Sequence, residues 1–502
     1  DAQAPQNQTI LNFQRIALGR RSRAAMQVGS EIFLFVNPKS GGNKGQVFLQ
    51  VPQPFLVPLR EGGTASLRIF SLLDGETGKK PGFLELKKTV ARSTTPVRMI
   101  VGGGDGTIMW GVTEAESVGI DVQKQLYVGV TPLGTGNDFA RAAGWGGKNP
   151  DGILENNCAL MTSLVQLWYS AKPAGHDVWQ VHVSVDDEYG DIQRIGDSKQ
   201  FESMGVKTIK KTMVNYCSFG QDSKIGVRFD QNRTKSQYGN MAVYAMACCA
   251  EEGQCWQAQH INNFLNSLHE GTTCSDPVIF DTDEDTDHPK LVGEPEMCIV
   301  VNIASYAGGL CQLWGEGSDF RSGVDPASDS IESPSRPGDG KLEVVTVPNV
   351  AALASDSLLH GAGRVASGGP LHFDFFECDK DEDEADIIAY HNVDGEFFKL
   401  LNPVHTTITR TRVLQVLHNV RRPGTTLDQM NDMMAAGQEL VFSQVTQAGQ
   451  MVSMQAAKVQ QFGVQASSQV ASSVNQVGSS VYQVTNQVTS SVNQAGRSTG
   501  LM

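Results

Sequence analysis

Three apolar runs in the first third of the chain each stop at a glycine-rich turn, and this arrangement limits the fold more than any other feature. The runs cover residues 32–36, 98–101 and 126–130, and the turns that follow them read NPKSGGNKG, GGGDGT and TPLGTGND. Continuous apolar runs of this length are typical of strands buried on both faces of a parallel sheet. We therefore predict an open α/β domain, in which ligands bind beyond the carboxyl ends of the strands.

Helices are predicted after the second and third turns, over residues 107–118 and 139–143. The segment after the first turn contains Pro52, Pro54 and Pro58, so any helix there is expected to be short.

The glycine-rich turns have the composition of a phosphate-binding site. Loops without Cβ atoms let consecutive backbone N–H groups point into one concavity, and such a concavity binds phosphate. Residues 37–42 add amide and hydroxyl groups, residues 102–107 add a carboxylate at a helix start, and residues 133–138 add a hydroxyl and an amide. No GxxxxGK[ST] pattern occurs, so the chain does not carry a P-loop.

Asp105 would repel a phosphate bound in such a loop unless a cation stood between them. Mg²⁺ takes carboxylate and phosphate oxygens together, so Asp105 is a candidate magnesium ligand. Its alternative role is that of a helix N-cap.

The second half of the chain reads as an antiparallel β domain. Short β-rich stretches separated by turn clusters are expected to form a sandwich, with few long helices; they cover residues 178–185, 214–219, 296–303, 342–347, 371–376 and 404–409. The acidic runs at 281–287 and 377–386 are interpreted as solvated insertions. The predicted fold class is thus an N-terminal open α/β nucleotide-binding domain followed by an antiparallel β-sandwich domain.

The predicted boundaries give four segments. They are a flexible N-terminal tail (1–30), the α/β domain (31–172), the β-sandwich domain (173–410) and a C-terminal segment (411–502). The last segment has valines three or four residues apart between 470 and 492 and no charged residue between 459 and 496. It is predicted either to stay disordered or to bind a membrane or a partner helix.

Composition excludes several classes of protein. The 40 basic and 54 acidic side chains give a formal charge of −14, which argues against a nucleic-acid-coating protein. No apolar run is long enough to span a membrane. The nine cysteines are scattered without a CxxC pair, so neither a disulfide framework nor a cysteine zinc site is expected. The first residues lack the apolar core of a secretory signal, and a cytoplasmic protein is the expectation.

The motifs NPKSGG, GGGDGT and LGTGNDFAR, in this order, resemble the catalytic domain of diacylglycerol kinases. The continuation GWGG is similar to the eukaryotic members, and NYCSFGQD, NIASY, LWG, DGKLEV and VDGE resemble stretches of their accessory domain. The resemblance covers roughly residues 31–410.

The resemblance implies a lipid kinase that transfers the γ-phosphate of ATP to diacylglycerol and gives phosphatidic acid. Glu396, in the DGE sequence, would be the general base, Asp105 would lie at the catalytic Mg²⁺, and Asp339 would support a structural metal site. Both DG dipeptides are also typical of hairpin turns. The implied nucleotide-binding residues are Asn37, Pro38, Lys39, Ser40, Gly41, Gly103, Gly104, Asp105, Gly106, Thr107, Gly134, Thr135, Gly136 and Asn137.

The chain also departs from the family pattern. NYFSIGVDA reads NYCSFGQDS here, and no cysteine- and histidine-rich lipid-binding module or EF-hand loop is present. Peripheral attachment to the membrane would then depend on a partner, on the basic N-terminal cluster, on the valine-striped tail, or on arginines 410, 412, 421 and 422. A sphingosine or ceramide kinase, an NAD kinase and a catalytically inactive scaffold are the competing interpretations, and the NPKSGG and GTGNDFAR motifs disfavour the NAD kinase.

Overall fold

The computed structural model describes residues 28–419, except for residues 149, 233–258, 284, 310–312, 314–320, 328–335, 351, 354–361 and 378–385. The N-terminal residues 1–27 and the valine-striped tail therefore lie outside the described residues, as do Arg421 and Arg422. Within the described part, no helix is long and apolar enough to cross a membrane.

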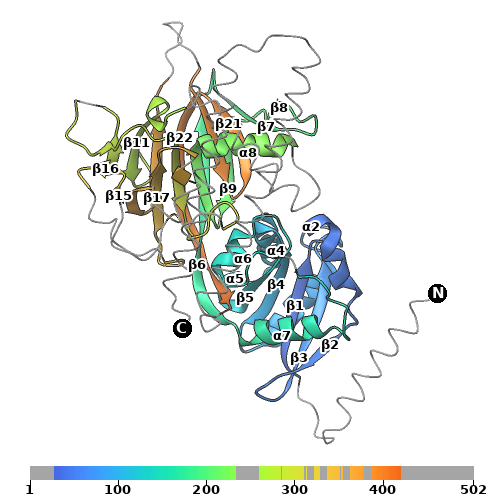
Figure 1. The fold of residues 1–502 in the computed structure, drawn as a ribbon. Coiled ribbons are helices and arrows are strands. Elements are labelled where there is room, and N and C mark those ends of the chain that lie inside the picture. Colours follow the sequence, from blue (N-terminus) through green and yellow to red (C-terminus); the bar gives the residue numbers. More distant parts are fainter. Residues whose placement is uncertain are drawn as a thin grey trace, which may run out of the picture. The chain divides into compact units, whose positions relative to one another are not determined.

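The first part of the chain forms the predicted α/β domain (Figure 1). Its elements are β1 (Val28–Val36), α2 (Ser40–Asn43), a 3₁₀ helix (Lys44–Gln50), β2 (Phe55–Pro58), β3 (Thr64–Ser71), α3 (Pro81–Arg92), β4 (Val97–Gly103), α4 (Asp105–Ser117), α5 (Val122–Gln125), β5 (Leu126–Pro132), α6 (Asp138–Ala142) and α7 (Ala159–Ser170).

The predicted apolar runs are the central parallel strands of this domain. β1 pairs in parallel with β3 and β4, and β4 pairs in parallel with β5. Their side chains are shielded on both faces, since residues 32–36 are all fully buried. The proline-rich segment after the first turn forms β2, which pairs antiparallel with β3. Pro52 and Pro54 precede this edge strand and Pro58 ends it, so they remove no bond from the centre of the sheet.

The second part is the predicted antiparallel β region, with one long helix that the sequence did not indicate. Its elements are β6 (Lys172–Val185), β7 (Asp191–Ile195), β8 (Phe201–Ser203), β9 (Thr208–Met213), β10 (Tyr216–Gly220), α8 (Gln221–Asn232), a 3₁₀ helix (Ile261–Asn263), β11 (Leu265–Glu270), β12 (Val278–Asp281), β13 (Lys290–Leu291), β14 (Met297–Val301), β15 (Arg321–Ser322), β16 (Val324–Asp325), β17 (Leu342–Val347), β18 (Gly363–Gly368), β19 (Leu371–Phe375), β20 (Ile388–Val393), β21 (Glu396–Leu401) and β22 (Pro403–His418).

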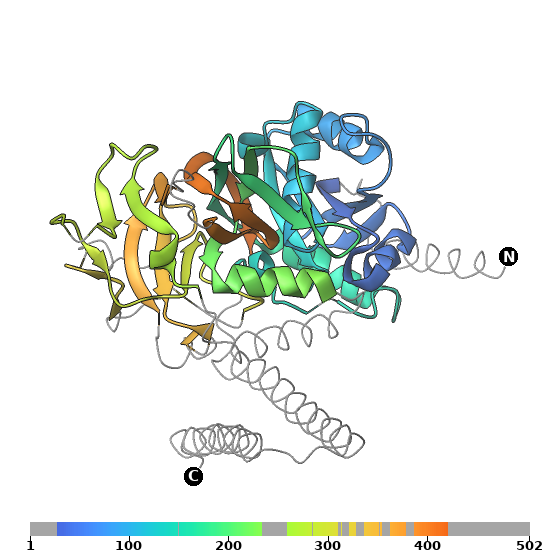
Figure 2. The same ribbon diagram turned by 90° about the horizontal axis from the view of Figure 1, so that it is seen from above.

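Two sheets enclose the core of this second part. One has the order β15-β18-β17-β14-β10-β20-β21-β7-β8. The other contains β12, β11, β19, β22, β6 and β9, and its buried face shares a single apolar cluster with the first sheet. Residues such as Val183, Phe219 and Val300 meet in that cluster, as a sandwich requires. Helix α8 packs against β20 and β21 of the first of these sheets (Figure 2).

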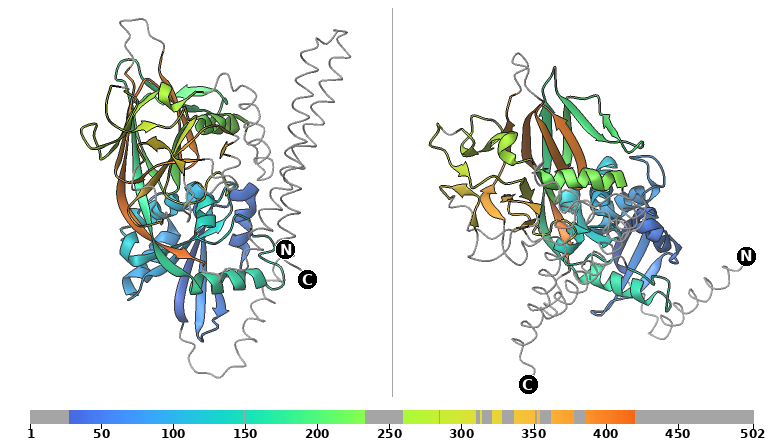
Figure 3. Two further views of the ribbon diagram at one scale, coloured as in Figure 1. Left: turned by 60° about the vertical axis from the view of Figure 1, so that its left-hand side comes forward. Right: turned by 45° about the horizontal axis from the view of Figure 1, so that its top comes forward.

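Strands β6 and β22 join the two parts of the chain into one continuous sheet. They pair antiparallel from Val185 and Pro403 to Lys172 and His418, and the far end of β22 pairs in parallel with β5 (Figure 3). β22 therefore passes the predicted boundary at residue 410, and β1 begins at Val28, inside the predicted N-terminal tail. The alternating pattern of the sequence cannot show that β22 continues into the first part of the chain, because a strand that changes sheet partners keeps the same period.

The cysteines in the described part of the chain are free thiols. Cys158, Cys217 and Cys298 are buried and Cys274 is exposed. Burial raises the pKa of the Cys217 and Cys298 thiols, so both stay protonated at neutral pH. The other five cysteines lie outside the described residues.

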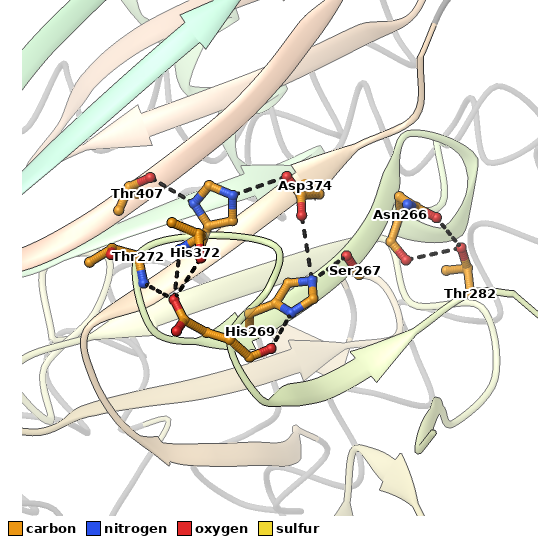
Figure 4. A network of polar contacts seen from close by, with 10 residues as sticks. Asn266, Ser267, His269, Thr272, Thr282, His372, Asp374 and Thr407 are labelled. Atoms are coloured by element: carbon orange, nitrogen blue, oxygen red, sulfur yellow. Dashed lines mark hydrogen bonds and ion pairs between the residues drawn. The ribbon is translucent and has the colours of Figure 1, made fainter. Parts of the chain in front are cut away.

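Histidines lie on the face of the β11-β19-β22 sheet that points away from the core, and Figure 4 shows two of them, His269 on β11 and His372 on β19. Asp374 contacts His372 at 3.0 Å and His269 at 3.4 Å, and His405 lies 5.2 Å from His372 between ring centres. His269 Nδ1 faces the carbonyl oxygen of Asp276 at 2.9 Å, so this nitrogen carries the proton. Among the described residues, no group of three or more His, Cys, Asp or Glu side chains is arranged to hold a metal ion.

Two other histidines, His176 and His391, are expected to remain neutral well below pH 6. Burial lowers the pKa of each to about 4, although each ring also bonds a backbone carbonyl. Because the folded-state pKa lies below the ordinary value of about 6.5, each ring stabilises the fold above pH 6.5 and loses this contribution as the pH falls toward 4. The loss is about 1.4 kcal/mol per ring at pH 5.5.

NMR titration of ¹³C-labelled histidine checks this prediction directly. The two resonances should stay nearly constant down to about pH 5. Titration of either resonance near pH 6.5, the ordinary value for histidine, would mean that water reaches the ring.

Candidate active site

The three glycine-rich loops meet at one edge of the parallel sheet, as the sequence predicts. Val36 pairs with Gly102, and Gly103 pairs with Pro132, so the three strands end side by side. The Asn37 N–H donates to Gly102 O at 2.9 Å, and the Leu133 N–H donates to Gly103 O at 2.9 Å. The sheet hydrogen bonding therefore continues into the loops and holds them together.

Glycine is required where the loops turn and where they touch. Gly41 and Gly42, inside α2, have φ values of 62° and 68°, a left-handed conformation that glycine adopts without steric cost. A Cβ on Gly134 would lie 2.6 Å from the Cα of Gly104. The second and third loops thus pack backbone against backbone, and a side chain at Gly134 would push them apart.

Most of the predicted nucleotide-binding residues reach solvent at this edge. Lys39 and Gly106 are exposed, and the partly exposed ones are Asn37, Pro38, Ser40, Gly41, Gly104, Asp105, Thr107, Gly134, Thr135 and Gly136. Gly103 is buried, where its missing Cβ leaves room for the Thr107 side chain.

Asn137 is buried, and its side chain makes hydrogen bonds with the backbone of its own loop and with Gly147. Its Nδ2 donates to Gly134 O at 3.0 Å and to Gly147 O at 2.8 Å, and its Oδ1 accepts from the Gly134 N–H. Both amide hydrogens are used within the protein, so the side chain of Asn137 has no donor left for a phosphate, in contrast to the expectation from sequence.

Asp105 lies between the second and third loops and caps the next helix. Its carboxylate accepts from the backbone N–H of Phe139 at 2.9 Å and of Asp138 at 3.3 Å, at the start of α6. Burial, and then the nearby charge of Asp138, raises the pKa of Asp105 to about 6 in spite of these donors. A cation bound beside it would relieve this charge.

Asp138 connects the loops to the second part of the chain, and the sequence did not single it out. Its carboxylate accepts from Ser305 Oγ at 2.6 Å, Gly308 N at 2.9 Å, Gly309 N at 3.0 Å and Tyr216 Oη at 3.1 Å. Asp138 is buried, and these four donors come from segments far along the chain. The GTGND motif contains this residue, but nothing in the motif indicates its partners.

The DGE turn brings Asp394, rather than Glu396, toward the glycine loops. Asp394 accepts from the backbone N–H groups of Val214, Asn215 and Tyr216 at 2.7–3.0 Å. Burial raises its pKa to about 7, and the charge of Asp105 contributes. Glu396 is 62% exposed, and its carboxylate pairs with Lys211 Nζ at 2.5 Å.

Asn215 carries a buried amide group with no ordinary partner. The residue is 1% exposed, and neither its Oδ1 nor its Nδ2 has a hydrogen-bond partner of normal geometry among the described residues. The amide lies close enough to Asp105 to lower the pKa of that carboxyl. An unpaired buried amide costs about 1–3 kcal/mol, and a bound ligand would recover this cost.

Asp339 lies in a tight turn. It is exposed, its Oδ1 accepts from the Lys341 N–H at 3.0 Å, and Gly340 has a φ of 83°. This geometry fits the turn interpretation of the DG dipeptide. In the described part of the chain, no group of three metal-binding side chains includes it.

Two family profiles match the chain, and together they cover both of its parts. The diacylglycerol kinase catalytic domain matches residues 31–167, and the diacylglycerol kinase accessory domain matches residues 212–397. The chain belongs to the diacylglycerol kinase family. All three glycine loops fall within the catalytic profile, and Asn215, Asp394 and Glu396 fall within the accessory profile.

Sequence relatives carry the same name. The chain is 32% identical over 210 residues to the eye-specific diacylglycerol kinase of Drosophila melanogaster. This alignment covers 40% of the chain and 12% of that protein. The match to human diacylglycerol kinase iota is 28% identical over 333 residues and covers 64% of this chain and 26% of that protein. The match to rat diacylglycerol kinase theta is 28% identical over 349 residues and covers 67% of this chain and 30% of that protein. The chain thus spans less than a third of the length of these relatives.

A crystal structure of a diacylglycerol kinase from Bacillus anthracis also aligns with the chain. It is 15% identical, with a TM-score of 0.36, over 78% of this chain and 97% of that one.

Proposed function

We propose that this chain transfers the γ-phosphate of ATP to the free hydroxyl of diacylglycerol and produces phosphatidic acid. The observation that carries the proposal is the meeting of three glycine loops at one sheet edge, with the Asp105 carboxylate between them. Phosphoryl transfer needs alignment and charge neutralisation more than covalent chemistry, and backbone N–H groups at a sheet edge supply both.

Asp105 is the proposed Mg²⁺ ligand. Its raised pKa and the unpartnered amide of Asn215 fit a cation in this place, and Mg²⁺ often takes one or two protein carboxylates and completes its shell with phosphate oxygens and water. When bound, Mg²⁺ would neutralise charge on the transferring phosphate. The protein itself would contribute the loop N–H donors, the first turn of α4 and the room that glycine leaves for the nucleotide.

Glu396 remains the proposed general base for the acceptor hydroxyl. Its exposure leaves the carboxylate accessible to a lipid substrate, and Lys211 holds it in position. The base would take the hydroxyl proton as the oxygen attacks the γ-phosphorus in line.

Glu396→Gln is expected to lower turnover roughly 10²- to 10⁴-fold while leaving ATP affinity unchanged, because the amide keeps the shape but cannot accept the proton. Steady-state kinetics and ATP titration measure the two quantities. The matched control is Glu202→Gln on β8, an exposed glutamate, which should have full activity. Full activity of Glu396→Gln would remove this residue from the mechanism and direct attention to Asp394.

The function itself is tested with one set of acceptors. Radiolabelled γ-phosphate should pass from Mg-ATP to diacylglycerol in mixed micelles and not to sphingosine, ceramide or NAD. Labelled sphingosine phosphate or ceramide phosphate would support the alternative lipid kinase. ATP binding without label in any acceptor would support the catalytically inactive scaffold.

Peripheral membrane association from the cytoplasm is part of the proposal, as is the division into a catalytic domain at 31–172 and an accessory domain at 173–410. Two of the basic residues considered for lipid attachment are engaged within the protein. Arg410 pairs with Asp177 at 2.6 Å, and Arg412 pairs with Glu116 at 3.2 Å. Attachment through a partner, through Arg421 and Arg422, through the valine-striped tail or through the N-terminal basic cluster remains the hypothesis.

A further inference from the structure

We infer that Arg141 is a phosphate-binding residue of the nucleotide site and contacts the terminal phosphates of ATP. This inference rests on the proposed function. Arg141 lies on α6, three residues after Asp138, and is exposed. Its Nε donates to the Gly136 carbonyl at 3.1 Å, so the guanidinium is anchored to the third glycine loop.

Two glycines leave the space in which the Arg141 guanidinium lies, and a third glycine anchors it. A Cβ on Gly147 would be 2.1 Å from Nη2 and 2.2 Å from Cζ, and a Cβ on Gly309 would be 2.9–3.2 Å from Cδ, Nη1 and Cζ. Gly136 provides the anchoring carbonyl. Gly147 comes from the first part of the chain and Gly309 from the second, so both parts shape this position.

The guanidinium keeps its remaining donors free. Among the described residues, neither Nη1 nor Nη2 of Arg141 has a hydrogen-bond or ion-pair partner, although the acidic Asp138 is three residues away. That carboxylate is already saturated by Ser305, Tyr216 and the backbone of 308–309. An anchored guanidinium with free donors matches the planar recognition of phosphate oxygens.

The position of Arg141 suits the terminal phosphates in particular. Gly136 borders both groups, because its carbonyl accepts from Arg141 Nε and a Cβ on Gly136 would lie 3.7 Å from Asp105 Oδ2. A triphosphate held by the loop N–H groups beside Asp105 would therefore bring its terminal oxygens close to both an acid and a cation. This pairing neutralises the charge that develops during transfer.

The test compares nucleotide affinities of the full chain by calorimetry in Mg²⁺ buffer. Arg141→Ala is expected to weaken ATP binding about 10- to 100-fold and to leave AMP binding within twofold, because only the terminal phosphates lose a partner. Gly147→Ala is the second variant. The atoms nearest to its new Cβ are those of the flexible end of Arg141, so the protein should fold, displace the guanidinium and show the same selective loss.

Arg60→Ala, which removes an exposed arginine from the β2–β3 turn, is the control for net charge and should bind both nucleotides normally. Equal losses for ATP and AMP would overturn the inference in favour of a structural role for Arg141, and unchanged ATP affinity in both variants would also overturn it. Wild-type chain that binds ATP through Arg141 but phosphorylates no lipid would refute the proposed function and leave this inference standing.

Discussion

Asp105→Asn is expected to reduce turnover roughly 10²- to 10³-fold and, at the same time, to stabilise the folded chain. The two effects have opposite signs because the carboxylate is needed for chemistry but is costly for folding. Burial and Asp138 raise its pKa to about 6, so at neutral pH the folded state holds the charged form at a cost. Asparagine removes the charge and keeps one oxygen, which can still accept from the Phe139 N–H.

The stabilisation should be about 1–2 kcal/mol at pH 7.5 and should disappear as the pH falls below about 4, where the wild-type carboxyl is protonated in both states. Urea unfolding at several pH values, combined with kinase assays at saturating ATP, measures both effects.

Asp121→Asn is the matched control for Asp105→Asn. Asp121 also caps a helix, accepting from the N–H groups of Gln123 and Lys124 at the start of α5, but it precedes β5, whereas the third glycine loop follows the other end of that strand. This variant should have full activity and slightly reduced stability. If Asp105→Asn had full activity as well, Asp105 would be only a helix cap.

Asp138→Ala is expected to have the largest effect on stability, a loss of roughly 3–5 kcal/mol. The substitution leaves four donors unpaired, two of them backbone N–H groups in the 308–309 turn. It also frees the Tyr216 hydroxyl, whose pKa is raised well above its ordinary value by burial and by Asp138. Because the 305–309 segment would lose its attachment to the third glycine loop, activity should fall even in the fraction that is folded.

Chemical denaturation and activity per folded molecule separate the two consequences. Ser305→Ala, which removes only one of the donors, should cost about 1 kcal/mol and preserve most of the activity. Equal losses for the two variants would contradict the view that Asp138 connects several segments.

The predictable part of the site is local. Each glycine loop follows its own apolar run, and the place where parallel strands end determines that the loops meet. Asp105 could also be predicted from local sequence, because a carboxylate in a glycine loop at the start of a helix has few possible roles. The second part of the chain was predicted as β-rich, but α8 was missed because its charged, weakly apolar sequence resembles a surface loop.

Other features depend on contacts between distant segments. Asn137 was expected to offer an amide to a phosphate, yet its donors are used by Gly134 and by Gly147, ten residues away. Asp394 and Glu396 are neighbours in the DGE turn, but only the first is directed to the backbone of 214–216. No local pattern distinguishes the two, since their surroundings come from β9 and β10.

The sequence by itself determined the parallel strands, the phosphate-type loops and the family, because these depend on residue types and spacings within short segments. Only the tertiary structure decided that β22 extends the first sheet, that Asp138 binds a segment 170 residues away, and that Arg141 lies in a space left by glycines from both parts of the chain. The physical reason is that burial and hydrogen-bond partners belong to pairs of segments, and a pair exists only once the chain has folded.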